Sequence, residues 1–138
     1  MDLGDLAKLY EQFWGEESSI SKMNETFTRI EKDENYILLG LKIDGRLAGS
    51  VMGVICQELY GDCKPFMVVE DVIVDKSFRR KGMGTKLMNR LETIAKQRNC
   101  SNIMFVTEKE RKDAHRFYSS LGFKHEGYKG YKKKLSFS

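Results

Sequence analysis

Several residue types that organise particular kinds of protein are scarce or poorly spaced in this chain of 138 residues. Proline occurs once, at Pro65, so no Pro-rich linker divides the chain. The cysteines and histidines are Cys56, Cys63, Cys100, His115 and His125. Because the cysteines are odd in number and neither residue type has the spacing of metal ligands, we expect no metal site and no disulfide framework. Reduced thiols indicate a cytoplasmic protein.

Long apolar runs and a strong charge of one sign are also missing. No run reaches about eighteen apolar residues, so we expect no segment that spans a membrane. The first residues are acidic and amphipathic and lack the basic-then-apolar order of a signal peptide. The net charge of +4 is mild, and the basic residues gather only at 79–81 and 129–134. Nucleic-acid binding would need a more sustained basic face, so we expect no nucleic-acid partner.

What the chain does contain is the composition and periodicity of one globular domain over residues 1–138. Apolar residues make up 41%, which is enough for a core, and neither a repeat nor a linker is visible. Two sets of apolar residues recur at helical spacing near the start and predict two amphipathic helices. They are Leu3, Leu6, Tyr10 and Phe13, then Ile20, Met23, Phe27 and Ile30.

The rest of the chain alternates strand and helix patterns. We predict strands over 36–43 and 46–60 joined by an Asp-Gly turn, followed by a strand that carries Glu70 and Asp71. A helix then ends near Asn99, a short strand covers 103–107, and a helix over 113–121 stops at Gly122. Strands over 123–128 and 131–137 close the chain. The order α-α-β-β-β-α-β-α-β-β predicts a mixed sheet with helices packed on it, in the α/β (α+β) class.

Residues 68–85, VVEDVIVDKSFRRKGMGT, are the most informative part of the sequence. An acidic pair interrupts a β-branched run, and a basic, glycine-spaced turn then opens a long amphipathic helix. The first N–H groups of a helix lack partners inside it, and the helix dipole places partial positive charge there. Gly82 and Gly84 allow close approach to the backbone, so the turn predicts a phosphate site beside two carboxylates.

Three phosphate-binding patterns compete for this turn. A Walker loop needs a Gly-Lys-Ser/Thr ending, which is absent, and a dinucleotide fingerprint needs Gly or Ala where Leu87 stands. The acyl-CoA pattern Arg/Gln-x-x-Gly-x-Gly/Ala is satisfied by Arg79, Gly82 and Gly84. Here the sequence resembles the GNAT superfamily of N-acetyltransferases.

A second stretch carries the same resemblance. The sequence DAHRFYSSLGF, from Asp113 to Phe123, is similar to the family's helix ending A-x-x-F-Y-x-x-x-G-F. Tyr118 takes the place of the tyrosine that protonates the leaving thiolate in many members. A core tyrosine on an amphipathic helix is the alternative, which two motifs in the right order disfavour. The resemblance implies a GNAT-like, mostly antiparallel central sheet with helices on both faces.

The resemblance also implies which residues bind acetyl-CoA as the co-substrate. Backbone amides of the glycine turn would hold the pyrophosphate, and the strand before the turn would pair with pantetheine. Arg111, at a frequent polar position of the family, would also contact the cofactor. The set is Val72, Ile73, Val74, Arg79, Arg80, Lys81, Gly82, Met83, Gly84, Thr85 and Arg111.

Roles for the acidic pair follow from the chemistry of an alkyl ammonium, which must lose a proton before it attacks a thioester. Neighbouring strand residues point to opposite faces, so Glu70 and Asp71 cannot both aim at one point without a bulge. The resemblance, which includes spermidine/spermine N-acetyltransferases with a similar pair, favours Glu70 as the base or as the group that orients a water. Asp71 would bind a substrate ammonium or brace the strand; the alternative is a pair of solvated carboxylates.

The acceptor is expected to lie near the first two helices. Phe13, Trp14 and Glu17, with neighbouring Glu16, suit a cationic amine, although a core-capping aromatic cluster is an equal interpretation. We therefore predict direct acetyl transfer to a primary amine of a small molecule, by a cytoplasmic enzyme that can form a homodimer. Local similarity to glucosamine-6-phosphate N-acetyltransferases leaves the acceptor open. A non-catalytic acyl-CoA-binding or regulatory module and a protein N-terminal or lysine acetyltransferase are the alternatives, and an ATP- or NAD-binding domain is a third.

Overall fold

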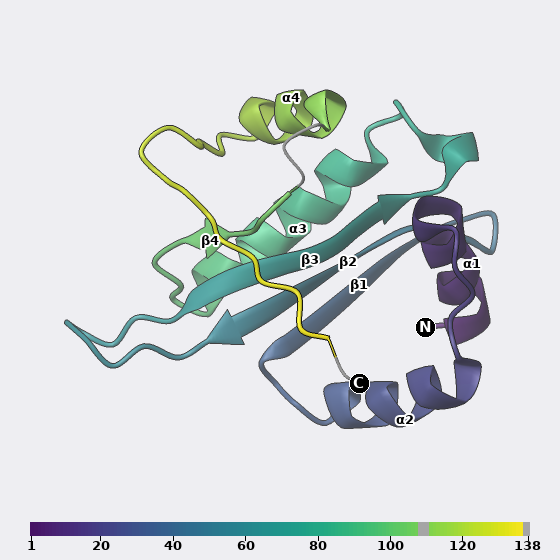
Figure 1. Cartoon of the computed structure of the whole chain (residues 1–138), viewed down its shortest axis with the longest axis horizontal. Coiled ribbons are helices and arrows are strands. Elements are labelled where there is room, and N and C mark those ends of the chain that lie inside the picture. Colours follow the sequence, from purple (N-terminus) through teal and green to yellow (C-terminus); the bar gives the residue numbers. More distant parts are fainter. Residues whose placement is uncertain (108–110, 137–138) are drawn as a thin grey trace. The chain divides into compact units, whose positions relative to one another are not determined.

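The structure is a computed structural model that describes residues 1–107 and 111–136. The chain divides into two compact units, Met1–Phe105 and Val106–Ser138. The first unit holds a four-stranded sheet with three helices, and the second holds one helix, α4 (Figure 1). Whether the two units form the single predicted domain stays a prediction.

The first two helices form where the apolar spacing predicts them. Helix α1 is Leu3–Trp14 and helix α2 is Ile20–Glu31. The side chain of Asp2 caps α1 by accepting a hydrogen bond from the Asp5 N–H, and Ser19 caps α2 in the same way. Gly15 ends α1 in the left-handed conformation, at φ +75°, which favours glycine. The chain therefore leaves the helical conformation at Gly15, and α1 and α2 are two separate short helices.

The sheet has the order β1-β2-β3-β4 (Figure 1). The strands are Tyr36–Ile43, Arg46–Cys56, Phe66–Val74 and Ile103–Met104. The first three form an antiparallel meander, and β4 lies parallel to β3. The prediction of a mixed, mostly antiparallel sheet is therefore confirmed.

Helices cover both faces of this sheet. Helix α3, Met83–Gln97, packs against β1, β2 and β3, and its Leu87 and Leu91 lie over Gly49 and Gly53 of β2. A Cβ atom at either glycine would come within about 3.1 Å of these leucines, so glycine permits the close packing. Helix α1 packs on the opposite face, where Leu6 and Leu9 contact buried side chains of β2 and β3. Those partners are Leu47 and Ile73.

Helix α4, Lys112–Ser120, ends as the sequence predicts. The Gly122 N–H donates to the Ser119 carbonyl and the Phe123 N–H donates to the Tyr118 carbonyl, both at 3.1 Å. Gly122 has φ +91°, and the rings of Tyr118 and Phe123 lie 6.1 Å apart. These are the two hydrogen bonds and the apolar contact of a Schellman motif.

Three predicted strands differ from the structure. Strand β2 ends at Cys56 rather than at position 60, because the following residues face solvent: Leu59 is 91% exposed and Tyr60 is 79% exposed. Strand β4 has two residues, not five. The predicted closing strands over 123–128 and 131–137 are absent from residues 111–136, the described part of the second unit; Phe137 lies outside the described residues.

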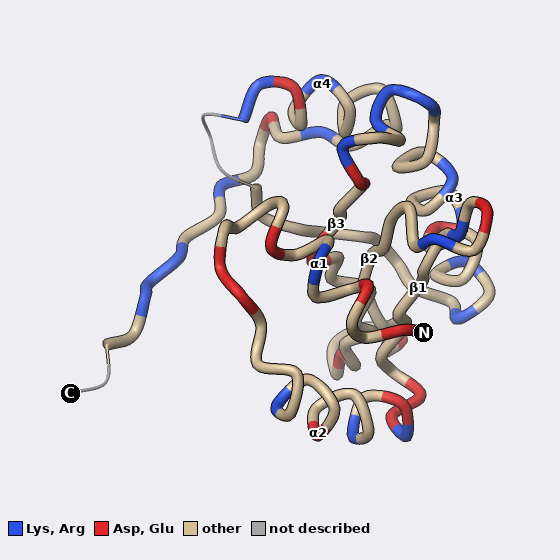
Figure 2. The backbone as a smooth tube through the Cα atoms, turned by 90° about the vertical axis from the view of Figure 1, so that its right-hand side faces the viewer, with Lys and Arg blue, Asp and Glu red and all other residues tan. Residues whose placement is uncertain are grey.

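The closing strands lack a physical reason to pair. Tyr128, Tyr131 and Leu135 are 72–84% exposed, so these apolar side chains of the two segments bury little surface. A two-stranded hairpin without such a face is marginal in water. Three consecutive lysines add charge repulsion, visible as the basic stretch of the C-terminal segment (Figure 2).

Within the residues that the structure describes, no helix is long and apolar enough to cross a bilayer.

Candidate active site

Strand β3 carries a bulge at the acidic pair. Met52 pairs with Glu70, whereas Ser50 pairs with Ile73, so Asp71 and Val72 together oppose one residue of β2. Asp71 has φ +57°, the left-handed conformation that the first residue of one bulge type adopts and that glycine usually fills. A bulge redirects side chains, and this one removes the strict alternation that would send the two carboxylates to opposite faces.

The two carboxylates lie in different environments. Glu70 is exposed, and Asp71 is half-buried. Burial, reinforced by the negative charge of Glu70, raises the pKa of Asp71. On the neighbouring helix, burial and the charge of Asp71 raise the pKa of Tyr10 to about 12. The Tyr10 phenol is therefore protonated at neutral pH and lies within electrostatic range of Asp71.

Tyr10 belongs to an aromatic cluster at the C-terminal end of α1. The ring of Trp14 lies 5.5 Å from Tyr10 and 5.0 Å from Phe13, edge to face in both pairs. Phe13 packs against the core, whereas Trp14 is 50% exposed and Glu17 is exposed. Phe13 thus completes the core, as the core-capping interpretation expects, and Trp14 presents its ring to solvent; amine binding by the cluster stays a prediction.

Strands β3 and β4 separate after a short pairing. Their parallel ladder joins only Met67 to Ile103 and Val68 to Met104, while β3 continues to Val74 (Figure 1). Beyond Val68, the ladders that the structure describes pair β3 with β2 alone. Val72, Ile73 and Val74 lie in this stretch, where β4 no longer pairs with β3 and where the Val74 carbonyl accepts a hydrogen bond from Arg79. The Ile73 side chain is itself buried, so only its backbone could meet a ligand.

The glycine turn between β3 and α3 has an unusual backbone. After the 3-10 turn Lys76–Phe78, Arg80 has φ +63° and Gly82 has φ +80°. Left-handed residues of this kind form a concave "nest" of N–H groups that binds anions. Gly82 is the N-cap of α3 and has no side chain to occupy the first-turn amides of Met83, Gly84 and Thr85.

The three basic side chains of the turn have different surroundings. The Arg79 Nε donates a 3.2 Å hydrogen bond to the Val74 carbonyl and so fastens the turn to β3. The Lys81 Nζ lies 5.8 Å from the centre of the Phe78 ring. Arg80 is exposed. Arg79 is thus fixed by the backbone of β3, whereas Lys81 lies beside an aromatic ring and Arg80 faces solvent.

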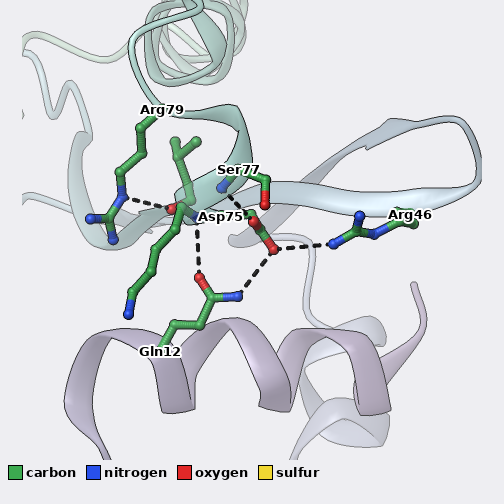
Figure 3. Close-up of polar contacts among 7 residues, drawn as sticks. Gln12, Arg46, Asp75, Ser77 and Arg79 are labelled. Carbon is green, nitrogen blue, oxygen red and sulfur yellow. Dashed lines mark hydrogen bonds and ion pairs between the residues drawn. The ribbon is translucent and has the colours of Figure 1, made fainter.

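Sequence reasoning missed Asp75, which directly follows β3 and is 6% exposed (Figure 3). Its carboxylate accepts hydrogen bonds from the Ser77 N–H at 2.8 Å and the Gln12 Nε2 at 3.1 Å. An ion pair joins it to Arg46 at 3.8 Å. The hydrogen bond from Ser77 is the main reason that the pKa of Asp75 is lowered, and burial acts in the opposite direction. The pattern Asp-Lys-Ser directly after a strand is the signal that could have indicated this turn.

The second unit carries the other predicted residues. Arg111 stands immediately before α4, and Tyr118 lies half-buried in its last turn. Burial raises the pKa of Tyr118, and the positive charge of Arg111 acts in the opposite direction. The Tyr118 phenol therefore holds its proton at neutral pH. His115 lies one turn before it on the same helix.

Comparison with protein families gives one clear match. The model described as "Acetyltransferase (GNAT) family" matches residues 3–123, which is most of the chain. N-acetylaspartate synthetase of Rattus norvegicus is 31% identical over 81 residues, which cover 59% of this chain and 27% of that protein. The matched stretch thus spans about a quarter of that curated relative's length.

Solved structures resemble the whole chain. A putative acetyltransferase from Agrobacterium tumefaciens str. C58 has a TM-score of 0.90 at 20% identity and covers 97% of this chain and 94% of its own. A protein described as a transcriptional regulator from Bacillus halodurans C-125 has a TM-score of 0.85 at 27% identity, with coverage of 98% and 96%. The first likeness is one of fold alone.

Proposed function

The chain belongs to the GNAT acetyltransferase family, and from this premise we propose that it transfers an acetyl group from acetyl-CoA directly to a primary amine of a small molecule. The observation that carries the proposal is the arrangement of residues 70–82. An acidic bulge stands at one end of this stretch and an amide-lined, left-handed turn at the other. No cysteine lies in either family motif, which supports transfer without a covalent enzyme intermediate.

The residues of the first unit fit the co-substrate. Acetyl-CoA, when bound, supplies an activated acetyl thioester. The amides from Arg80 to Thr85 would hold its pyrophosphate, since a nest and a helix N-terminus both favour anions. The separated edge of β3 offers backbone groups that would pair with the amides of the pantetheine arm. Arg79 and Lys81 would add positive charge to the phosphate region. For Arg111, the family resemblance alone supports a contact with the co-substrate.

Two side chains would move protons. Glu70 is exposed, so its carboxylate can accept the proton of the ammonium directly or through a water. Tyr118, with its raised pKa, holds a phenolic proton that it can donate to the leaving thiolate. The exposed carboxylate would thus receive one proton, and the half-buried phenol would supply another.

The acceptor site would recognise a cation. Asp71 supplies negative charge, and the exposed Trp14 supplies an aromatic face of the kind that attracts ammonium groups. Tyr10, which the sequence analysis counted only among the periodic residues of the first helix, adds a neutral hydroxyl near Asp71. Glu17 lies exposed three residues after Trp14 and would extend the negative charge. A small amine with a second cationic or hydroxyl group matches this set.

The test has two stages. Titration calorimetry with acetyl-CoA asks whether the co-substrate binds, and a thiol-release assay over a panel of polyamines, aminoglycosides, amino sugars and lysine peptides asks which amine reacts. We expect binding and CoA release with at least one cationic small amine. Binding without release on any amine would support the non-catalytic acyl-CoA-binding module, an alternative that the likeness to the Bacillus halodurans protein favours. Release on the peptides alone would indicate a protein acetyltransferase, and binding of ATP or NAD instead would refute the proposal.

The proposal places the enzyme in the cytoplasm, where its three cysteines, all free in the structure, stay reduced. A homodimer is part of the proposal only as an expectation from the family. Analytical ultracentrifugation would decide it.

A further inference from the structure

Gln12 uses both ends of its side-chain amide to join α1 to the start of the cofactor turn, which is the segment 75–82 between β3 and α3 (Figure 3). Its Nε2 donates to the Asp75 carboxylate at 3.1 Å, and its Oε1 accepts from the Lys76 N–H at 3.2 Å. Donor and acceptor are therefore both engaged by two consecutive residues. These residues begin the stretch that leads from β3 to the amide nest.

The far side of Asp75 continues this network toward the nest. Arg46 forms the ion pair with Asp75, and its guanidinium carbon lies 5.7 Å from the centre of the Phe78 ring. Lys81 of the turn lies over the same ring, at 5.8 Å. A continuous set of contacts thus runs from α1 through Asp75 and Arg46 to the basic turn.

We propose that Gln12 is a positioning residue that holds the cofactor turn in its binding conformation through Asp75 and Lys76. Gln12 immediately precedes Phe13 and Trp14, so the same contact places the aromatic end of α1 relative to the turn. The inference rests on the proposed use of acetyl-CoA. A turn that is already ordered loses less conformational entropy when it binds, and this difference appears as affinity.

The Gln12 amide donates at one end and accepts at the other, so the contact can be tested by exchanging the amide and the carboxylate between positions 12 and 75. Gln12→Glu keeps the acceptor for Lys76 but sets a second carboxylate against Asp75. Asp75→Asn keeps the acceptor for Ser77 but sets an NH₂ group against the Gln12 NH₂ group. In the double variant Q12E/D75N, the carboxylate at position 12 accepts from both the side-chain amide at position 75 and the Lys76 N–H. Both hydrogen bonds of position 12 are then restored and the pair keeps one negative charge, whereas the ion pair of position 75 with Arg46 is lost in D75N and in the double variant alike.

Calorimetry with acetyl-CoA would measure the dissociation constant of each variant, with the melting temperature of each recorded alongside. We expect Q12M, Q12E and D75N each to weaken binding by about three- to tenfold at a temperature well below unfolding. The double variant should regain most of the affinity that D75N loses, because these two variants lack the Arg46 ion pair equally and differ only at position 12. Q97M, the same change at an exposed glutamine of α3, is the matched control and should bind normally.

The outcomes separate the two proposals. If the wild type binds acetyl-CoA and Q12M binds equally well, the positioning role is overturned and the proposed function stands. The role is also overturned if the double variant regains its melting temperature without regaining affinity, because Gln12 is then a structural contact only. If the wild type fails to bind acetyl-CoA, the proposed function fails and the inference falls with it.

Discussion

Tyr10 of α1 and Asp71 of β3 interact electrostatically, although the helix and the strand that carry them are far apart in the sequence. The charge of Asp71 adds to burial in raising the pKa of Tyr10 to about 12, and the pKa of Asp71 is itself raised, first by burial and then by Glu70. A protonated phenol, a half-buried carboxyl group and an exposed one therefore share one region. Such a region stabilises an additional positive charge better than an additional negative one.

The acidic bulge should reduce the stability of the ligand-free protein. Asp71→Asn removes a half-buried charge beside Glu70 and keeps a residue that tolerates the left-handed conformation. We expect the free energy of unfolding at pH 7 to rise by about 0.5 kcal/mol, the scale of a partly exposed charge pair. Because the pKa of Asp71 is raised in the folded state, the gain should shrink as the pH falls through that pKa and vanish below the unfolded value.

Urea unfolding of Asp71→Asn at a series of pH values measures this gain. Asp44→Asn is the matched control, because Asp44 is also left-handed, at φ +50°, but exposed in a hairpin turn. An equal gain in both variants at every pH would assign the effect to backbone preference and not to charge.

Removal of the proposed base should slow turnover without loss of the co-substrate. Glu70→Gln leaves a side chain of the same size that cannot accept the ammonium proton, so kcat should fall by about 10²-fold. The dissociation constant of acetyl-CoA should stay within about twofold, since Glu70 lies outside the turn. Steady-state kinetics on a reactive amine measures the first quantity and calorimetry the second. Glu25→Gln, at an exposed position of α2, should leave both unchanged.

The proposed acid should determine the alkaline limit of the reaction. With its pKa raised above 10.0, Tyr118 stays protonated through neutral pH, and loss of its proton at higher pH should lower kcat. Tyr118→Phe should reduce kcat by about 10²-fold and abolish this alkaline decline. A pH–rate profile distinguishes the two effects. Tyr128→Phe, at a phenol that is 78% exposed, should retain the wild-type profile; an unchanged profile in Tyr118→Phe would contradict the role.

Substitution of Gly82 should weaken the binding of acetyl-CoA in addition to straining the backbone. Gly82→Ala places a Cβ atom in open space but strains a residue at φ +80°, with a cost of about 1 kcal/mol in stability. Gly45→Ala does the same at φ +78° in the β1–β2 hairpin and so provides the stability control. We expect similar melting temperatures for both, but an affinity for acetyl-CoA weakened by about tenfold only in Gly82→Ala. Equal affinities would remove the turn from the binding site.

Local patterns were sufficient for most elements of the fold. The apolar spacing of α1 and α2, the Asp-Gly hairpin and the Gly122 cap depend on neighbours within a few positions, and the structure confirms each. The closing strands were predicted wrongly for the described residues because strand pairing depends on a distant apolar surface. Exposed Tyr128 and Tyr131 have β propensity but no such surface within their unit.

Some features of the candidate site could likewise be predicted from neighbouring residues, whereas others depend on contacts between distant parts of the chain. The glycine turn and the acidic pair are visible in the sequence, because residue type and spacing alone predict an anion site. The φ of Asp71, the joint placement of Tyr10 and Trp14, and the Gln12–Asp75 contact could not be read there. Gln12 and Asp75 are 63 positions apart, and no local pattern links them.

The sequence by itself determined the helices, the mixed sheet and the chemistry expected of residues 68–85. The reason is that caps, periodicity and glycine spacing act over a few bonds. Only the tertiary structure decided where β3 bulges, how far β3 and β4 stay paired, and which residue of α1 holds the turn. Those features depend on contacts between segments that the sequence keeps far apart, such as the packing of α1 against β2 and β3.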